Sequence, residues 1–452
     1  MLETPLRDLG GDIIFEENNR GQLIPARRFS PDYWLMKDVQ QPSTPREAAP
    51  PPQASTRRRE PLRLREEWHQ FVVLLKRAFI SKLRNPANLL TTILEAPLLA
   101  LLTGMVLRYS ESDVYDFASA FHIPTYLFLS LVVAMFLGLT NSVDDIIRDR
   151  PVLMRERNLD VRLIYYVLAK ALTLAAFAVI QCALFAWIGN WLLALRGGFW
   201  IVFIAMFLTT GSGVAIGLVI SSLVAESKTG ILIIPAVLIP QIILSGALIK
   251  YEEMNRNLDF VYTIQQWVTK HPDSAMPARS DLMVPLICEL MPTRWSYEAL
   301  VFAQAKLNPL TRRQETIQSQ INRLVAEKNP TPAQEDRLED LKDTLAVLSG
   351  LEASDPRALD SKFGGIDAII AGGPFDRSAF KGSGSGVTAE QLYVNQKVTD
   401  LMSKAEMEQS DYRENRHLNV FFGPVKEYIG LRAGILWFNS LALIGSTLGL
   451  FF

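Results

Sequence analysis

The chain has 452 residues, of which 49% are hydrophobic and 21% charged, and its formal net charge is −1. The near-zero charge argues against a nucleic-acid-binding protein, which would carry a basic surface. Two cysteines, Cys182 and Cys288, are too few for a disulfide framework or a cysteine-rich metal site, and we interpret them as buried small residues.

The N-terminal part of the chain is polar and then becomes amphipathic. Residues 1–60 are rich in proline and predict a flexible cytoplasmic tail or linker, with a short hairpin within GDIIFEENNRGQLIPARRF. Residues 62–84 place apolar side chains at helical spacing among basic ones. This pattern predicts a basic amphipathic helix in the headgroup region of an anionic leaflet, and the alternative is a helix packed on a soluble partner domain.

Six apolar runs follow, each long enough to cross about 30 Å of hydrocarbon as a helix. They are residues 87–107, 124–143, 171–195, 197–225, 229–249 and 433–452. The runs are continuous and do not alternate like barrel strands, so we expect an all-α membrane protein with six transmembrane helices.

Lysine and arginine are concentrated before the first run and between the second and third, which places both segments in the cytoplasm. The expected parts are a cytoplasmic tail (1–60), the amphipathic helix with spans one to five (61–250), a mainly helical extracytoplasmic insertion (251–431) and span six (432–452).

The insertion itself carries helical signals. Residues 282–305 predict short helices that fold back onto the membrane. Residues 312–328 and 332–350 each have an apolar face, and the break between them falls at Asn329-Pro330-Thr331-Pro332. The two stretches predict a helical hairpin.

No catalytic motif accompanies the spans. A P-loop requires GxxxxGK[ST], and the dipeptide Gly-Lys does not occur in the sequence. The four histidines are scattered, without HExxH, GxSxG or zinc-ligand spacing. We therefore expect no catalytic residue, no metal site and no cofactor in this chain.

The loop between spans two and three is the strongest positive signal. It reads NSVDDIIRDRPVLMRERNLDVRLIYYVLAKAL, with dense charge of both signs, and it runs directly into the next span. The loop is either a solvated tether or a short helix that docks on a motor domain and transmits its movement.

Four stretches, taken in order, resemble the membrane domain of the G subfamily of ABC transporters, within the type-2 exporter permeases and most closely the bacterial members. They are EEWHQFVVLLKRAFISKLRNPANL, RPVLMRERNLDVRLIYYVLAK, PQIILSGALI and MPTRWSYEAL. The resemblance covers residues 62–310 and 415–452. Under this resemblance the amphipathic helix is the family's connecting helix, and the charged loop contains its coupling helix.

The resemblance implies a half-transporter in the bacterial inner membrane. Two such permease domains would form a homodimer or a heterodimer, and a nucleotide-binding domain, the ATPase, would use ATP and Mg²⁺ in another chain. By position, the coupling helix would include Arg155, Glu156 and Arg157. The translocation path would include Phe136, Leu137, Ala247 and Leu248. The family often has two bulky residues where this chain has Ala247 and Leu248, which bears on the tightness of the gate.

Glu95 is the one charged residue in the first run. A lone carboxylate in lipid costs a few kcal/mol, so it needs a partner or water. Lys170, at a similar depth in span three, is the candidate, and a structural ion pair is favoured over a proton or substrate site.

The leading hypothesis is therefore an ATP-driven export permease. The runner-up is a non-transporting membrane scaffold or regulatory subunit that binds periplasmic proteins through the insertion. A membrane-embedded enzyme comes third, because catalytic constellations are missing.

Overall fold

The computed structural model describes residues 13, 15–17, 23–25, 64–109, 115–156, 162–254, 284–327, 331–350, 365–373, 380, 388–411, 420–428 and 431–451. The chain divides into two compact units, Met1–Arg63 and Leu64–Phe452. In the first unit, β1 (Phe15–Glu17) pairs antiparallel with β2 (Leu23–Pro25), and Phe15 lies opposite Pro25. The hairpin predicted in this part of the chain is confirmed.

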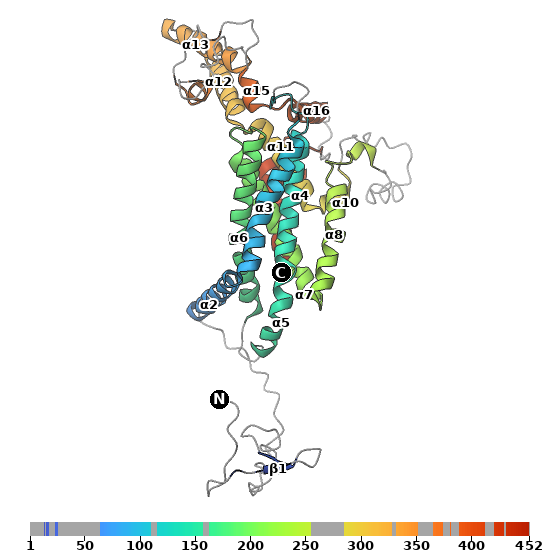
Figure 1. Ribbon diagram of the computed structural model, residues 1–452. Coiled ribbons are helices and arrows are strands. Elements are labelled where there is room, and N and C mark those ends of the chain that lie inside the picture. Colours follow the sequence, from blue (N-terminus) through green and yellow to red (C-terminus); the bar gives the residue numbers. More distant parts are fainter. Residues whose placement is uncertain are drawn as a thin grey trace, which may run out of the picture. The chain divides into compact units, whose positions relative to one another are not determined.

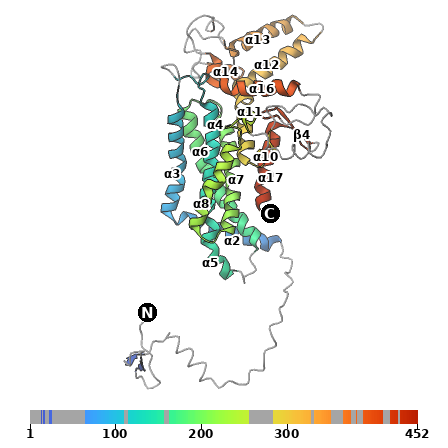
Figure 2. The same cartoon turned by 90° about the vertical axis from the view of Figure 1, so that its right-hand side faces the viewer.

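The second unit is built on a bundle of apolar helices that run side by side (Figure 1 and Figure 2). They are α3 (Pro86–Leu107), α4 (Ile123–Ser142), α6 (Leu163–Leu192), α7 (Phe199–Leu223), α8 (Ser227–Ile243) and α17 (Ile435–Phe451). Among the described residues, four helical segments are long and apolar enough to cross a membrane: Leu89–Leu107, Ile123–Arg155, Leu163–Leu192 and Phe199–Leu223. Ser227–Ile243 and Ile435–Leu450 are apolar but shorter. The chain is therefore a multi-pass membrane protein, and the count of six spans stays a prediction.

Two further helices lie at one end of this bundle. They are α2 (Leu64–Leu83) and α5 (Asp145–Glu156), which follows α4 after a short turn (Figure 1). Helix α2 is the amphipathic helix that the sequence predicts over residues 62–84. The helices of the predicted insertion between residues 309 and 411 lie at the opposite end (Figure 1 and Figure 2).

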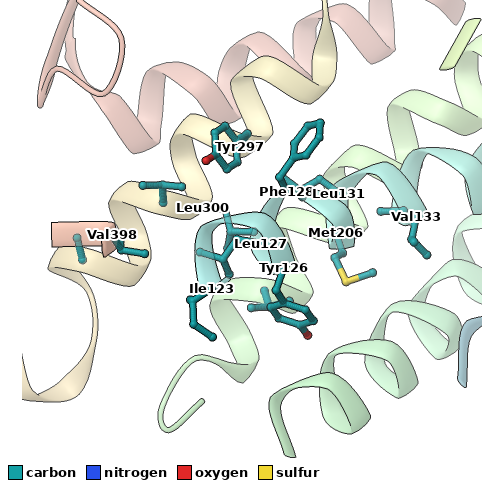
Figure 3. Close-up of a cluster of buried hydrophobic side chains, with 14 of the residues drawn as sticks. Ile123, Tyr126, Leu127, Phe128, Leu131, Val133, Met206, Tyr297, Leu300 and Val398 are labelled. Atoms are coloured by element: carbon teal, nitrogen blue, oxygen red, sulfur yellow. The ribbon is translucent and has the colours of Figure 1, made fainter. Parts of the chain in front are cut away.

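The main hydrophobic core lies where α4 meets α6, α7 and the short helix α11 (Pro292–Lys306). Figure 3 shows its centre, with side chains from α4 facing others from α7, from α11 and from α16 (Gln396–Asp411). The labelled residues are Ile123, Tyr126, Leu127, Phe128, Leu131, Val133, Met206, Tyr297, Leu300 and Val398. This core joins the membrane helices to the chain that lies between α8 and α17.

A second, smaller core holds the predicted helical hairpin together. Helix α12 (Pro309–Val325) packs on α13 (Pro332–Leu348), and α14 (Ile366–Ile370) and α15 (Ala389–Tyr393) complete the core. Ile317 and Ile321 of α12 are buried with Leu341 and Leu345 of α13 packed against their cluster, so the hairpin and its apolar faces are confirmed.

The remaining elements of the insertion are mainly helical, as predicted, with one strand pair that the sequence did not predict. The predicted short helices over residues 282–305 are present as α10 (Leu286–Glu289) and α11, and a single 3-10 turn, η2, covers Tyr251–Glu253. However, β3 (Val425–Tyr428) pairs antiparallel with β4 (Leu431–Gly434) directly before α17. Each of these strands has only four residues, so the sequence shows neither a helical pattern nor a long alternation of apolar and polar residues from which the hairpin could be predicted.

Candidate functional site at the α5 end of the bundle

Helix α5 has an acidic residue, Asp145, in its first turn and a basic residue, Arg155, in its last turn. This arrangement suits the helix dipole. Ile146 and Leu153 pack against a small buried cluster formed by α2 and α6, which includes Phe71. Ile146 and Leu153 therefore hold α5 against the bundle, so residues 145–156 of the charged loop form a helix packed on α2 and α6.

The first turn of α5 and the end of α7 cap each other. The Ser221 hydroxyl accepts hydrogen bonds from the backbone N–H groups of Ile146 at 3.0 Å and Ile147 at 3.2 Å. In return, Arg150 Nη2 donates to the carbonyl oxygens of Ser222 at 3.2 Å and Val224 at 2.8 Å. These are groups that helix ends leave without intrahelical partners, so each helix satisfies the other.

Partly buried ion pairs join the first two turns of α5 to α2 and α6. Lys82 Nζ of α2 lies 3.1 Å from Asp145 Oδ1. Lys170 Nζ of α6 lies 2.9 Å from Asp149 Oδ2 and 3.8 Å from Asp145 Oδ2. Tyr166 donates a further hydrogen bond to Asp149 at 3.1 Å. Because the Lys170 side chain is only 7% exposed, breaking these pairs would leave a buried charge without compensation.

Outer contacts extend the network to the neighbouring helices. Glu67 of α2 accepts a hydrogen bond from Tyr165 at 2.6 Å and pairs with Arg162 Nη1 at 2.6 Å. Ser227, the first residue of α8, donates to Asp144 just before α5. A displacement of α5 would therefore act on α2, α6, α7 and α8 together.

The network also passes into the apolar part of the bundle. Lys82 Nζ donates to the carbonyl oxygen of Asn141 at 3.2 Å, and the Asn141 amide donates to Gln181 Oε1 at 2.9 Å. Gln181 in turn donates to the carbonyl oxygen of Thr92 at 2.7 Å. This polar chain links α3, α4 and α6.

Lys170 does not pair with Glu95, and that expectation is wrong. Lys170 has Asp149 and Asp145 of α5 as partners, whereas Glu95 is half-buried in α3, and no ion pair joins the two within the described part of the chain. The position of Glu95 and Lys170 in the sequence indicated only the depth of each residue along its own helix. It did not show that α5 would pack against the face of α6 that carries Lys170.

The residues expected on the coupling helix lie at the far end of α5. Arg155 is exposed in the last turn, and Glu156 is the last residue of the helix. The side chain of Glu156 and the whole of Arg157 are outside the described residues. Sequence reasoning missed Lys82, Asp149 and Ser221. A signal for Asp149 was present, because Asp145 and Asp149 are four residues apart and so share one face of a helix.

The four residues expected on the translocation path differ in burial, and Leu137 and Ala247 share the main core. Leu137 is fully buried in the main core, and Phe136 is half-buried against α8. Ala247 is half-buried beyond the end of α8, whereas Leu248 is 64% exposed.

Comparison with known proteins identifies this part of the chain. Residues 69–266 match the ABC-2 type transporter family, and the matched segment runs from α2 past the end of α8. No curated protein matches the chain. The match supports a type-2 ABC permease domain over this segment, as the sequence motifs predicted.

Proposed function

Proceeding from a type-2 permease domain at residues 69–266, we propose that the chain is the membrane subunit of an ATP-driven exporter in the bacterial inner membrane. It pairs with a second permease domain, identical or related, and works with a nucleotide-binding domain in another chain. ATP and Mg²⁺ are used in that partner. In this proposal α8 and α17 complete a set of six spans.

One observation carries the proposal, namely the contrast between the two ends of α5. Its first turn is held by ion pairs and mutual caps to α2, α6 and α7, with Asp144 just before it bonded to α8. Its last turn is exposed, with Arg155 and Met154 open to a partner. A push on the exposed turn is therefore delivered to several helices at once, which suits a coupling element between a motor domain and a permease.

The proposed topology has independent support. The basic segments flank the α5 end of the bundle, and the insertion lies at the opposite end (Figure 1 and Figure 2). With basic residues retained inside, the insertion faces the extracytoplasmic side.

The translocation path is proposed to form between two permease domains. A path between subunits is compatible with the exposure of Leu248 and with the partial exposure of Phe136, because neither is enclosed within its own chain. In this proposal Leu137, which is buried, packs behind the residues that line the path, and the small side chain of Ala247 forms the gate together with Leu248.

The test is charge reversal at the exposed turn of α5, with Arg155→Glu combined with Glu156→Lys. The variant should still reach the membrane, while stimulation of the partner ATPase by the permease falls by about tenfold or more, as expected for loss of charged interface contacts. Arg323→Glu, an exposed reversal on α12 at the other end, is the matched control and should leave stimulation unchanged. Unchanged stimulation in the α5 variant would defeat the coupling role.

A scaffold or regulatory subunit is the second candidate. The observation in its favour is that α12 to α15 form a core separate from that of the membrane helices, as a partner-binding module would. That function predicts that the α5 charge reversal leaves any associated transport intact, while deletion of the α12–α13 hairpin abolishes capture of an extracytoplasmic partner.

A further inference from the structure

Glu95 is the only charged residue in the six apolar runs. The first membrane-crossing segment begins at Leu89, so Glu95 lies about 9 Å inside it by helical rise. Its side chain is half-buried, its oxygens are not enclosed, and it makes no hydrogen bond or ion pair within the described part of the chain. A charge at this depth is costly, so a carboxylate retained there without a partner points to a function.

The carboxylate lies on the side of α3 that is nearer to α4. Glu95 follows Thr92 by three residues and precedes Leu99 by four, so the three share one face of the helix. Thr92 Oγ1 donates to Asn141 Oδ1 of α4 at 3.4 Å, and Leu99 packs on the core that α4 helps to form. Glu95 is therefore at the boundary between α3 and α4.

At this level α4 has a face that the chain leaves open. Because consecutive spans run in opposite directions, Glu95 lies about 4–5 Å beyond the Asn141 contact, within about one helical turn of Phe136. Phe136 belongs to a line of partly exposed side chains at helical spacing, the open face of α4, which consists of Leu129, Val132, Phe136 and Thr140. Figure 1 shows α4 between α3 and α8, so Glu95 borders this face from the α3 side.

The spans offer no counter-ion for Glu95. The six apolar runs contain no lysine or arginine, so the spans of a second copy cannot supply one either, and Lys170 is used by Asp149 and Asp145. A metal ion needs several ligands, and no group of three or more His, Cys, Asp or Glu side chains in the described residues could hold one. The open face of α4 is mainly apolar, so it suits a cation that carries an apolar body.

We propose that Glu95 pairs with the positive group of an amphipathic organic cation whose apolar body lies on the open face of α4, and that this pairing selects the cargo. The Phe136 ring adds attraction for the same positive charge. The inference rests on the proposed translocation path, because Phe136 is one of its expected residues. Binding of the cation itself requires neither ATP nor the partner ATPase.

The experiment measures binding of tetraphenylphosphonium, a lipophilic cation, to the full chain in detergent by equilibrium dialysis at neutral pH. Glu95→Gln should weaken this binding by about tenfold or more, because it removes an ion pair from a region of low dielectric constant. Tetraphenylborate has nearly the same size and shape and the opposite charge, and its binding should not weaken. Glu95→Gln should fold, since an amide costs less in the membrane than an unpaired carboxylate, and Glu95→Asp, which keeps the charge, should bind the cation within about threefold of the unmodified chain.

Glu335→Gln is the matched control, since it removes the same charge from an exposed position on α13. It should change the affinity for tetraphenylphosphonium by less than about twofold, as expected for a screened surface charge. Equal losses in the Glu95 and Glu335 variants would show diffuse attraction and overturn the site. An affinity of Glu95→Gln within about twofold of the unmodified chain would show that Glu95 is a neutral acid or faces only lipid, and it would overturn the site as well.

The result is separable from the coupling test at α5. Weakened cation binding in Glu95→Gln, together with unchanged ATPase stimulation in the α5 charge-reversal variant, would support the cation site and contradict the coupled exporter. The opposite pair of results would support the exporter and contradict the cation site.

Discussion

Glu298 is held in a fully buried charge cluster that connects α11 to the chain returning toward α17. Its Oε1 lies 2.5 Å from Lys426 Nζ and accepts a hydrogen bond from the Phe422 backbone N–H at 2.7 Å. Its Oε2 accepts from the Asn439 amide at 3.0 Å and lies 3.4 Å from Arg294 Nη2. Burial acts to raise the pKa of Glu298, but Lys426 and Arg294 outweigh it and hold the pKa below its ordinary value. The carboxylate is therefore ionised at neutral pH.

Glu298→Gln keeps the shape of the side chain and an acceptor for Phe422, but it removes the negative charge. Arg294 and Lys426 are 0% exposed, so both cations would stay buried beside a neutral amide. Removing one partner from a buried ion pair costs about 3–5 kcal/mol, and we expect a loss of that size in the free energy of unfolding.

The assay is an unfolding titration with SDS in mixed micelles, with Glu406→Gln as the control. Glu406 pairs with Lys306, which lies on the same helix α11, but both side chains are more than one third exposed, and this pair should contribute at most about 1 kcal/mol. Adding Lys426→Met to Glu298→Gln should recover part of the loss, because one uncompensated charge is then removed. A loss below about 1 kcal/mol in Glu298→Gln would refute the reasoning.

Three further substitutions test the packing of the bundle. Gly138→Ala would place a Cβ atom 2.5 Å from the Thr210 carbonyl oxygen, so it should separate α4 from α7 and lower the unfolding midpoint in SDS. Gly211→Ala on α7 is the control, because its Cβ atom would meet nothing within 4 Å, and it should be neutral or slightly stabilising. Ser221→Ala should cost about 0.5–2 kcal/mol of protection against hydrogen exchange at the first turn of α5, and Ser222→Ala, whose hydroxyl bonds only within α7, should cost none. Gln181→Leu should destabilise the protein by about 0.6 kcal/mol, and by at most about 1.7 kcal/mol, in the same SDS titration, since these are the average and the maximum for hydrogen bonds between membrane helices. A neutral result would show that the amide chain from α3 to α6 contributes nothing.

The amino-acid sequence by itself determined the features that depend on local composition. Runs of apolar residues predicted the membrane helices, since covering about 30 Å of hydrocarbon requires about 20 such residues in series. The facing leucines and isoleucines predicted α12 and α13, and ordered motifs predicted the permease family that residues 69–266 match. For the charged loop the sequence left a solvated tether and a short helix that docks on a motor domain as alternatives; α5 shows the short helix, and its docking on a motor domain stays a prediction.

Only the tertiary structure decided which side chains meet. Lys170 was expected to pair with Glu95 because the two lie at similar depths, yet it pairs with Asp149 on a helix whose packing direction no local pattern encodes. The Ser221 hydroxyl that accepts from Ile146, and Arg150 that donates to Val224, join α5 to α7. Lys426, buried in a short hairpin, likewise pairs with Glu298 of α11, far away in the chain. Hydropathy and periodicity report how far along a helix a residue lies and which face is apolar. The partner of a polar group depends on how the helices rotate and pack, which is decided by the sum of contacts across the whole bundle.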